Sequence, residues 1–338
     1  MGYRRLDQVI HWAGRHHQRL KWLHSLWALL LGIGVIFFFR HDFGFIRLII
    51  AYLFFIWTAS LLLHWEAARW SITEERRPKI RRVVLYIIQN FYHEMLFFIL
   101  PLYYTSTTFS SPNALFLVLI VGCALLASFD SVYWHWLTGN TWWPRVFYCF
   151  LLFACFNIFF PVIVGIRNSY GLYLAGGASA LAMITLSRHP REWWSLAAGK
   201  HFASALAVIL LCLYIFRGLI PPCPLVLHEV TFSTAFQPKG LRSIHEIRGA
   251  EELAEAKFLY VLAAVKAPLG IYEKVVIEWY RNGRSVRQGR LVTMTGGREE
   301  GFRIWDGIRL SEKPVAEYRV DVESEGGQLI GRGYLPVR

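Results

Sequence analysis

The sequence predicts an α-helical polytopic membrane bundle of about seven transmembrane helices, followed by an all-β domain of the immunoglobulin-like sandwich type. Three observations support this fold class. The 338-residue chain is 55% hydrophobic and 16% aromatic, more than ordinary soluble domains contain. Apolar stretches long enough to cross a bilayer fill the first 220 residues. After Pro221 and Pro222 the hydrophobic period changes from 3.6 to 2, which marks a domain boundary.

The first 21 residues form a basic, amphipathic segment. Five cations, Arg4, Arg5, Arg15, Arg19 and Lys21, are interleaved with aromatic residues. Such a pattern is typical of a helix that lies on a membrane surface. We expect a cytoplasmic segment that anchors to lipid headgroups, and a helix that binds a partner protein is the alternative.

The helical domain, 22–220, contains seven apolar segments with few charges. Each is about 18 to 25 residues long, the length that a transmembrane helix needs. The predicted spans are 22–39, 45–63, 83–104, 113–133, 146–166, 169–187 and 202–219. Small residues at Gly171, Ala175, Gly176, Ala178 and Ala180 give the sixth span a surface for close helix packing.

The distribution of positive charge predicts the orientation. Residues 1–220 hold 19 Lys and Arg against 8 Asp and Glu, whereas 221–338 hold 17 against 15. A cytoplasmic N-terminus places 15 of the 19 cations on the cytoplasmic side, as the positive-inside rule requires. An odd number of spans then exports the C-terminal domain. We therefore expect a multi-pass protein of a bacterial inner membrane whose domain 221–338 is periplasmic.

The C-terminal domain contains seven predicted strands. They are 225–236, 257–266, 274–281, 285–293, 301–310, 316–323 and 328–337, with a short helix or loop at 250–256. Hairpin turns are expected at Asn282-Gly283 and at 325–327. The alternation of apolar and polar residues predicts a core of Val275, Ile277, Trp279, Phe302, Ile304, Ile308, Tyr318, Val320 and Val322. Gly331 and Gly333 predict a bulge or a close approach of two backbones.

Several of these segments resemble a known family. They are VKAPLG (265–270), VVIEWYRNG (275–283), GFRIWDG (301–307), AEYRVDV (316–322) and GGQLIGRGYLPV (326–337). This part of the chain is similar to the C-terminal module of an uncharacterised bacterial family, domain of unknown function 2914. The stretch 93–116 and SFDSVY (128–133) resemble the family less sharply, and Ile277 stands where the family usually has histidine. The resemblance implies a multi-pass inner-membrane protein with a periplasmic module, and it implies no activity.

Polar residues in the middle of the third span are the strongest candidates for chemistry. Gln89, Asn90, His93 and Glu94 fall on one face of a helix, and such residues inside a membrane face protein or water. Asp130 and His135 are the nearest residues that could join them. An interhelical hydrogen-bond network, ligand or proton handling, and a metal site all remain open. The zincin pattern is absent, because Phe97 occupies the position of its second histidine.

A second candidate site lies on the β-domain. Strand alternation that buries Ile304 turns Arg303 and Trp305 outward. The same argument applies to Glu278, Tyr280, Arg319 and Arg332. An exposed tryptophan and tyrosine with arginines could stack on a sugar ring and hold an acidic polymer, or could dock a protein. The alternative is that Trp305 packs on the membrane half of the chain or faces the core of the second sheet.

Other function classes find no support. Four of the five cysteines lie in apolar segments, which argues against a disulfide framework, and no base stands beside them. No phosphate-binding glycine loop, Ser-His-Asp arrangement or nucleic-acid motif is present. We expect no cofactor and no metal. The expected partners are the lipid bilayer and an envelope protein or glycan, and a homo-oligomer stays open.

The sequence therefore supports a non-enzymatic membrane protein that displays a β-sandwich for binding an envelope partner. The alternative is a membrane enzyme or transporter that handles a lipid-linked or small polar substrate through the face of His93 and Glu94.

Overall fold

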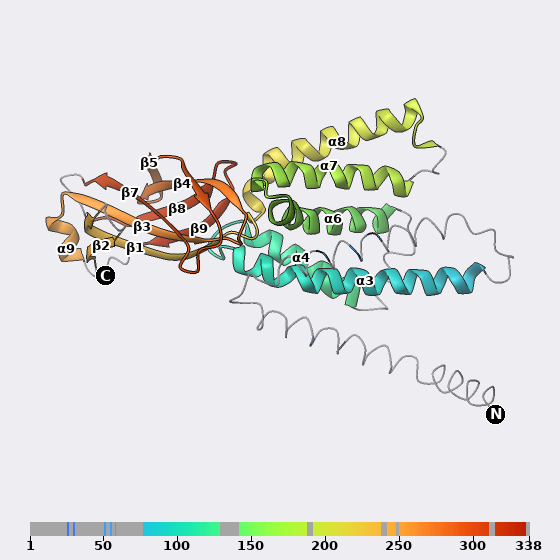
Figure 1. Cartoon of the computed structure of the whole chain (residues 1–338), viewed down its shortest axis with the longest axis horizontal. Helices are drawn as coiled ribbons and strands as arrows, with labels where there is room; N and C mark the ends of the chain where they lie inside the picture. Colours follow the sequence, from blue (N-terminus) through green and yellow to red (C-terminus); the bar gives the residue numbers. More distant parts are fainter. Residues whose placement is uncertain are drawn as a thin grey trace.

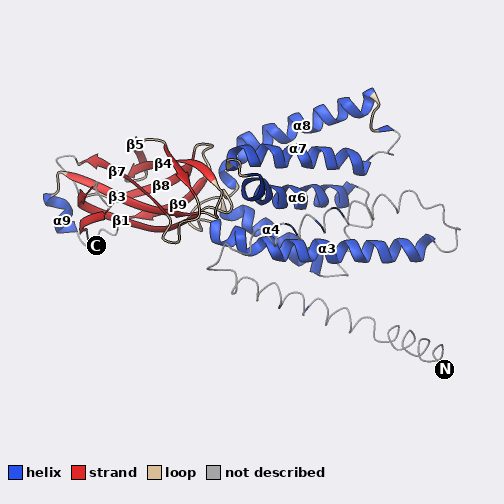
Figure 2. Cartoon of the chain, viewed as in Figure 1, coloured by secondary structure: helices blue, strands red, loops and turns tan. Residues whose placement is uncertain are grey.

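A computed structural model of the chain consists of a helical region joined end to end to a β-region (Figure 1). The structure describes residues 77–128, 142–187, 192–237, 242–247, 250–310 and 315–335, together with isolated positions 26, 30, 51, 55 and 58. The long helices run lengthwise on one side, and both sheets lie on the other, with one short helix at their far end (Figure 2).

The described helical region contains four long α-helices and a shorter one. They are α3 (Arg77–Ser106), α4 (Ala114–Ser128), α6 (Trp142–Phe159), α7 (Asn168–Ser187) and α8 (Leu196–Phe216). The π-helical turn η1 (Phe160–Val164) extends α6, and the 3₁₀ turn η3 (Arg217–Leu219) extends α8. Pro161 in η1 packs against α7, where a Cβ at Gly171 would lie 2.9 Å from the proline ring.

Three of these helices are long and apolar enough to cross a membrane. They are Arg145–Val164, Asn168–Ser187 and Leu196–Leu219, and Ala114–Ser128 is apolar but shorter. The structure therefore supports three candidate spans within its described residues, where the sequence predicted seven. Two of the seven, 22–39 and 45–63, lie outside the described residues apart from isolated positions.

The small residues of α7 serve helix packing, as the sequence predicted. Ala175 is fully buried, and a Cβ at Gly176 would lie 2.6 Å from Leu213 of α8. Close contact between α7 and α8 therefore requires glycine at this position.

The β-region consists of two antiparallel sheets. The first has the order β2-β1-β3-β7, from β1 (Val226–Gln237), β2 (Arg242–Glu246), β3 (Phe258–Lys266) and β7 (Phe302–Arg309). The second has the order β5-β4-β8-β9, from β4 (Tyr272–Arg281), β5 (Arg284–Gln288), β8 (Tyr318–Ser324) and β9 (Leu329–Tyr334). β6 (Val292–Thr295) also pairs with β4, and the short helix α9 (Ala250–Glu255) precedes β3.

The core between the sheets matches the prediction closely. Eight of the nine predicted residues are buried, and Phe302 packs against them while partly exposed. The rings of Phe232 in β1 and Trp279 in β4 meet across the sheets, with centroids 6.2 Å apart. The Trp279 indole donates to Asp306 Oδ2 of β7 at 3.0 Å, so this buried N–H is satisfied from the opposite sheet.

Two strand predictions need correction. The predicted strand 285–293 is two strands, β5 and β6, because the chain breaks at Gly289, whose amide donates to the Ile277 carbonyl. A Cβ at Gly289 would lie 2.7 Å from Asp306, so a side chain has no room there. The sequence also missed β2, a short polar strand that pairs only with the end of β1 within the described residues.

The two glycines of β9 mark a close approach of strands from different sheets. A Cβ at Gly331 would lie 2.3 Å from Leu227, and one at Gly333 would lie 2.6 Å from Val230. Both contacts are with β1, so β9 closes one side of the region against the first sheet. The register of β8 with β9 also shifts beside Val322, so the predicted bulge is present. The atoms of β1 that approach the two glycines belong to side chains and not to a second backbone.

Candidate functional site

The polar residues of α3 are packed among the helices. Gln89 and His93 are 3% and 5% exposed, and Glu94 is partly buried. Gln89 Nε2 donates to the Ala127 carbonyl of α4 at 3.0 Å, and His93 meets the Phe97 ring edge-on. Asn90 lies in α3, whereas Asp130 and His135 lie outside the described residues. The described contact of Gln89 joins two helices, as an interhelical network requires.

A second polar contact between helices was not predicted. Asn157 of α6 donates to the hydroxyl of Tyr103 in α3 at 3.0 Å, and that hydroxyl donates to the Ala154 carbonyl at 2.9 Å. Asn157 is a polar residue among apolar residues in α6, and this feature of the sequence could have predicted the contact. Within the described residues, no group of three His, Cys, Asp or Glu side chains could hold a metal ion.

The helical region and the β-region meet at a junction rich in hydrogen bonds. Side chains on each side donate to backbone carbonyls on the other, at 2.8 to 3.3 Å. The pairs are Asn113 with Leu329, Asn168 with Pro222, Gln328 with Ile220, and Arg332 with Ser110. Each donor is a side chain and each acceptor is main chain. Together these bonds fix the β-region against the ends of the helices.

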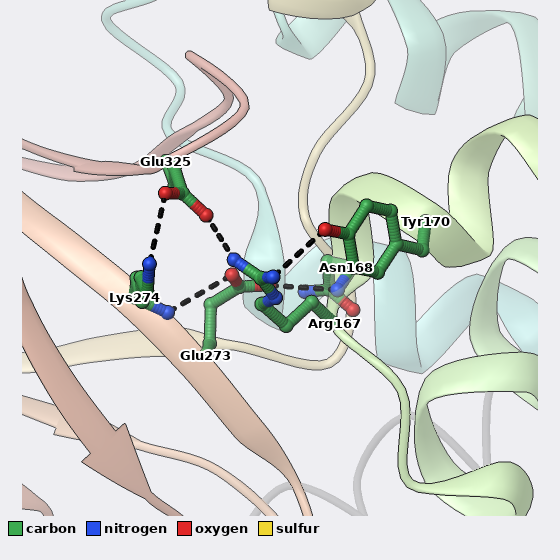
Figure 3. A network of polar contacts seen from close by, with 6 residues as sticks. All are labelled: Arg167, Asn168, Tyr170, Glu273, Lys274 and Glu325. Carbon is green, nitrogen blue, oxygen red and sulfur yellow. Dashed lines mark hydrogen bonds and ion pairs between the residues drawn. The ribbon is translucent and has the colours of Figure 1, made fainter.

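An ionic network strengthens the same junction (Figure 3). Arg167, between η1 and α7, pairs with Glu325 in the turn between β8 and β9, and Lys274 of β4 reaches the other oxygen of Glu325 at 3.2 Å. Arg167 also donates to the Tyr170 hydroxyl at 2.8 Å and lies over its ring. The Glu325 side chain is 37% exposed, so solvent weakens these ion pairs.

Glu273 is the buried acid of the junction. Its Oε2 accepts from the backbone N–H of Asn168 at 2.7 Å, and its Oε1 accepts from the N–H of Lys274 at 3.0 Å. Asn168 begins α7, so a carboxylate from the β-region caps a helix of the other region. Burial raises the pKa of Glu273, and the two backbone N–H groups and Arg167 oppose that rise.

The six residues of the predicted binding surface lie on two different sheets. Glu278, Tyr280, Arg319 and Arg332 belong to the second sheet, whereas Arg303 and Trp305 belong to β7 of the first. The outer faces of two sheets that share a core point in opposite directions. The residues therefore form two surfaces.

On the second sheet, the predicted residues contact one another. The Arg319 guanidinium lies 3.8 Å from the centroid of the Tyr280 ring, and Arg332 binds both oxygens of Asp321 at 2.7 and 2.8 Å. Burial, and then the charge of Glu278, raise the pKa of Tyr280 to about 12. Arg332 also bonds to Ser110, so this arginine belongs to the junction.

On the first sheet, Trp305 belongs to a cluster of four aromatic residues, which we call the aromatic cluster. Trp305 stacks on Phe236 with ring centroids 4.5 Å apart, and Tyr260 lies 6.5 Å from Trp305. Phe236 and Phe258 both stack on Tyr260. Trp305 remains 42% exposed despite these contacts. The outward orientation expected for Trp305 is present. Its described ring contacts are with Phe236 and Tyr260 of its own sheet, and not with the helical region or the core between the sheets.

The position of the aromatic cluster follows from the strand directions. β1 leaves the junction at Val226 and β3 returns to it at Lys266, and these two residues pair. Phe236 and Phe258 therefore lie toward the opposite end of the sheet, away from the helices. Trp305 pairs with Leu262 in the middle of β3, so the cluster reaches from the middle of the sheet to the end that is remote from the helical region.

Comparisons with known proteins place the chain in a family without assigning a role. No curated protein and no solved structure matches it. Residues 3–260 match a family of unknown function, DUF5924. This match supports an uncharacterised family but not the name suggested by the motifs after residue 264, which lie beyond it. Because the match covers more than half of its length, the chain belongs to the DUF5924 family.

Proposed function

We propose that this DUF5924 protein is a non-enzymatic, multi-pass protein of a bacterial inner membrane that displays a β-sandwich for binding an envelope partner. The observation that carries the proposal is the aromatic cluster, which leaves Trp305 42% exposed on the outer face of the first sheet. Aromatic side chains offer a large contact area at low entropic cost, which suits a protein or glycan ligand.

The order of the strands supports an immunoglobulin-like sandwich. β1, β3 and β7 are neighbours in one sheet, and β4, β8 and β9 are neighbours in the other. Immunoglobulin domains divide their strands in the same way, into A, B and E against C, F and G. Trp279 on β4 and Tyr318 at the start of β8 stand where those domains place a buried tryptophan and a tyrosine.

Membrane insertion is supported by Arg145–Val164, Asn168–Ser187 and Leu196–Leu219. The excess of cations in the predicted cytoplasmic connections favours a cytoplasmic N-terminus and a periplasmic β-region. A reporter fused after Arg338 tests this orientation. Activity of a reporter that works only in the periplasm agrees with it, and activity of one that works only in the cytoplasm contradicts it.

Capture from envelope extract tests the binding function. The full chain in lipid nanodiscs is incubated with solubilised bacterial envelope, and bound carbohydrate and bound protein are measured separately. Trp305→Ala should abolish capture of one of these two, either the carbohydrate or the protein. The matched control is Tyr334→Ala, which removes an aromatic residue of similar exposure, 46%, from β9 of the second sheet and should leave capture intact. Equal capture by the parent chain and Trp305→Ala would contradict the proposal.

The alternative function, a membrane enzyme or transporter acting through His93 and Glu94, makes a different prediction. Glu94→Gln and His93→Ala would then abolish activity in cells while the purified chain kept its stability in detergent. If stability alone falls, the α3 residues serve the helix network, in line with the bond from Gln89 to α4.

A further inference from the structure

The turn between β3 and β4 presents an apolar side chain from a fixed backbone. The Gly297 amide donates to the Ala267 carbonyl at 2.9 Å, and the Gly296 amide donates to the Ile271 carbonyl at 2.8 Å. Leu269 lies between these two anchors, and its side chain is 69% exposed. A Cβ at Gly297 would lie 2.6 Å from Leu269 Cδ1, so the neighbouring loop supports the leucine closely from one side.

This turn lies where the candidate spans end. α6 with η1 ends at Val164, α7 begins at Asn168, and α8 with η3 ends at Leu219, and all three places belong to the junction. A Cβ at Gly165 would lie 3.4 Å from the carbonyl oxygen of Gly270. The residue that follows Val164 thus lies beside the residue that follows Leu269.

The neighbours of Leu269 extend the apolar surface on both sides of this contact. Tyr272, three residues further along the chain, is 42% exposed, and Val164 at the end of its span is 58% exposed. A single exposed leucine needs no explanation in a soluble domain. An exposed leucine, a tyrosine and the end of a membrane helix at one level match the composition of a membrane interface.

We propose that the β-region contacts the bilayer directly, with the Leu269 side chain inserted at the boundary between headgroups and acyl chains. The proposal rests on the membrane insertion proposed above and adds a lipid-binding element outside the helices. The partner is the lipid surface of the leaflet beside the junction. The contact holds the β-region at a fixed height and directs the aromatic cluster away from the membrane.

Site-specific photo-crosslinking tests the proposal. The photoreactive residue p-benzoylphenylalanine replaces Leu269 in the full chain, which is then reconstituted in nanodiscs of phosphatidylethanolamine and phosphatidylglycerol. Replacement of Leu211 on α8 serves as the membrane control, since this side chain is 59% exposed within a candidate span. Replacement of Val286 on β5 is the matched control, because it is 52% exposed and lies beyond the Asn282-Gly283 turn, far from the junction.

The expected result is lipid adducts at positions 269 and 211 and none at 286, as measured by mass spectrometry of the irradiated protein. Adducts at 211 without adducts at 269 would overturn the lipid contact and leave membrane insertion standing. Adducts at neither position would overturn both proposals. Crosslinks from 269 to a second copy of the chain, or equal lipid adducts at 286, would also overturn the contact. Each variant's melting temperature in detergent should match the parent, because all three side chains are exposed.

Discussion

Glu273 caps the first turn of α7, and its removal is the most direct test of what stabilises the junction. Glu273→Ala removes the acceptor of a buried N–H at Asn168 and of a partly buried N–H at Lys274. A buried donor without an acceptor costs about 1–3 kcal/mol. Loss of the buried carboxylate, whose charged form burial disfavours, offsets part of that cost. We expect opening of the junction to become easier by about 2 kcal/mol.

Amide hydrogen exchange measures this change where it occurs. Since 1.4 kcal/mol corresponds to a factor of ten, exchange at Asn168 should accelerate about 30-fold in the full chain in nanodiscs. Glu325→Ala is the matched control, because it also removes a glutamate from the junction but breaks only half-exposed ion pairs worth about 0–1 kcal/mol. Equal exchange at Asn168 in the two variants would refute the capping role.

Three further predictions concern the junction and the β-region. Burial raises the pKa of Glu273 above its ordinary value of 4.5, so the folded chain retains a proton that the unfolded chain releases. Stability should therefore fall as pH rises from about 4.5 through the folded pKa. Glu273→Gln should reduce this fall in thermal unfolding curves recorded at several pH values, and the remainder is expected from Glu323, whose pKa burial also raises. Gly331→Ala should destabilise the chain by about 1–3 kcal/mol in thermal unfolding, because β1 occupies the space of its Cβ, whereas Gly218→Ala, with open space around it, should change stability by less than about 0.5 kcal/mol. Asp306→Ala should cost about 1–3 kcal/mol by leaving the Trp279 indole N–H buried without its acceptor, and Asp306→Asn, which keeps an acceptor oxygen, should cost less in the same measurement.

Local pattern predicted most of the β-region because apolar and polar residues alternate along parts of its longer strands. Val275, Ile277 and Trp279 share one face of β4, and burial selects that face. The missed strand β2 lacks this alternation, since it is short and polar and pairs with the end of β1. The strand breaks at Gly289 because Asp306 of another strand lies against this glycine. A local sequence pattern contains no information about such a contact.

For the candidate sites, the sequence predicted which helix or strand carries each residue but not which of these elements lie together. Period and alternation placed Gln89, His93 and Trp305 on their correct elements and faces. They could not show that Arg303 and Arg319 lie on opposite sheets, because that depends on strand order. The contact of Glu273 with Asn168 joins residues 105 positions apart, and neither residue stands in a motif or periodic pattern that would have predicted it.

The main-chain acceptors at the junction affect how far the sequences of the two regions can differ among relatives. Ser110, Pro222, Ile220 and Leu329 each accept through a carbonyl that any amino acid would supply. Substitution of these side chains therefore leaves the hydrogen bonds available, provided that the backbone keeps its path. The four donor side chains are therefore the residues that the junction depends on most. Relatives could differ widely in the side chains around the acceptors and still form the same junction. A chimera that exchanges the β-region between relatives should keep its orientation when it retains these donors.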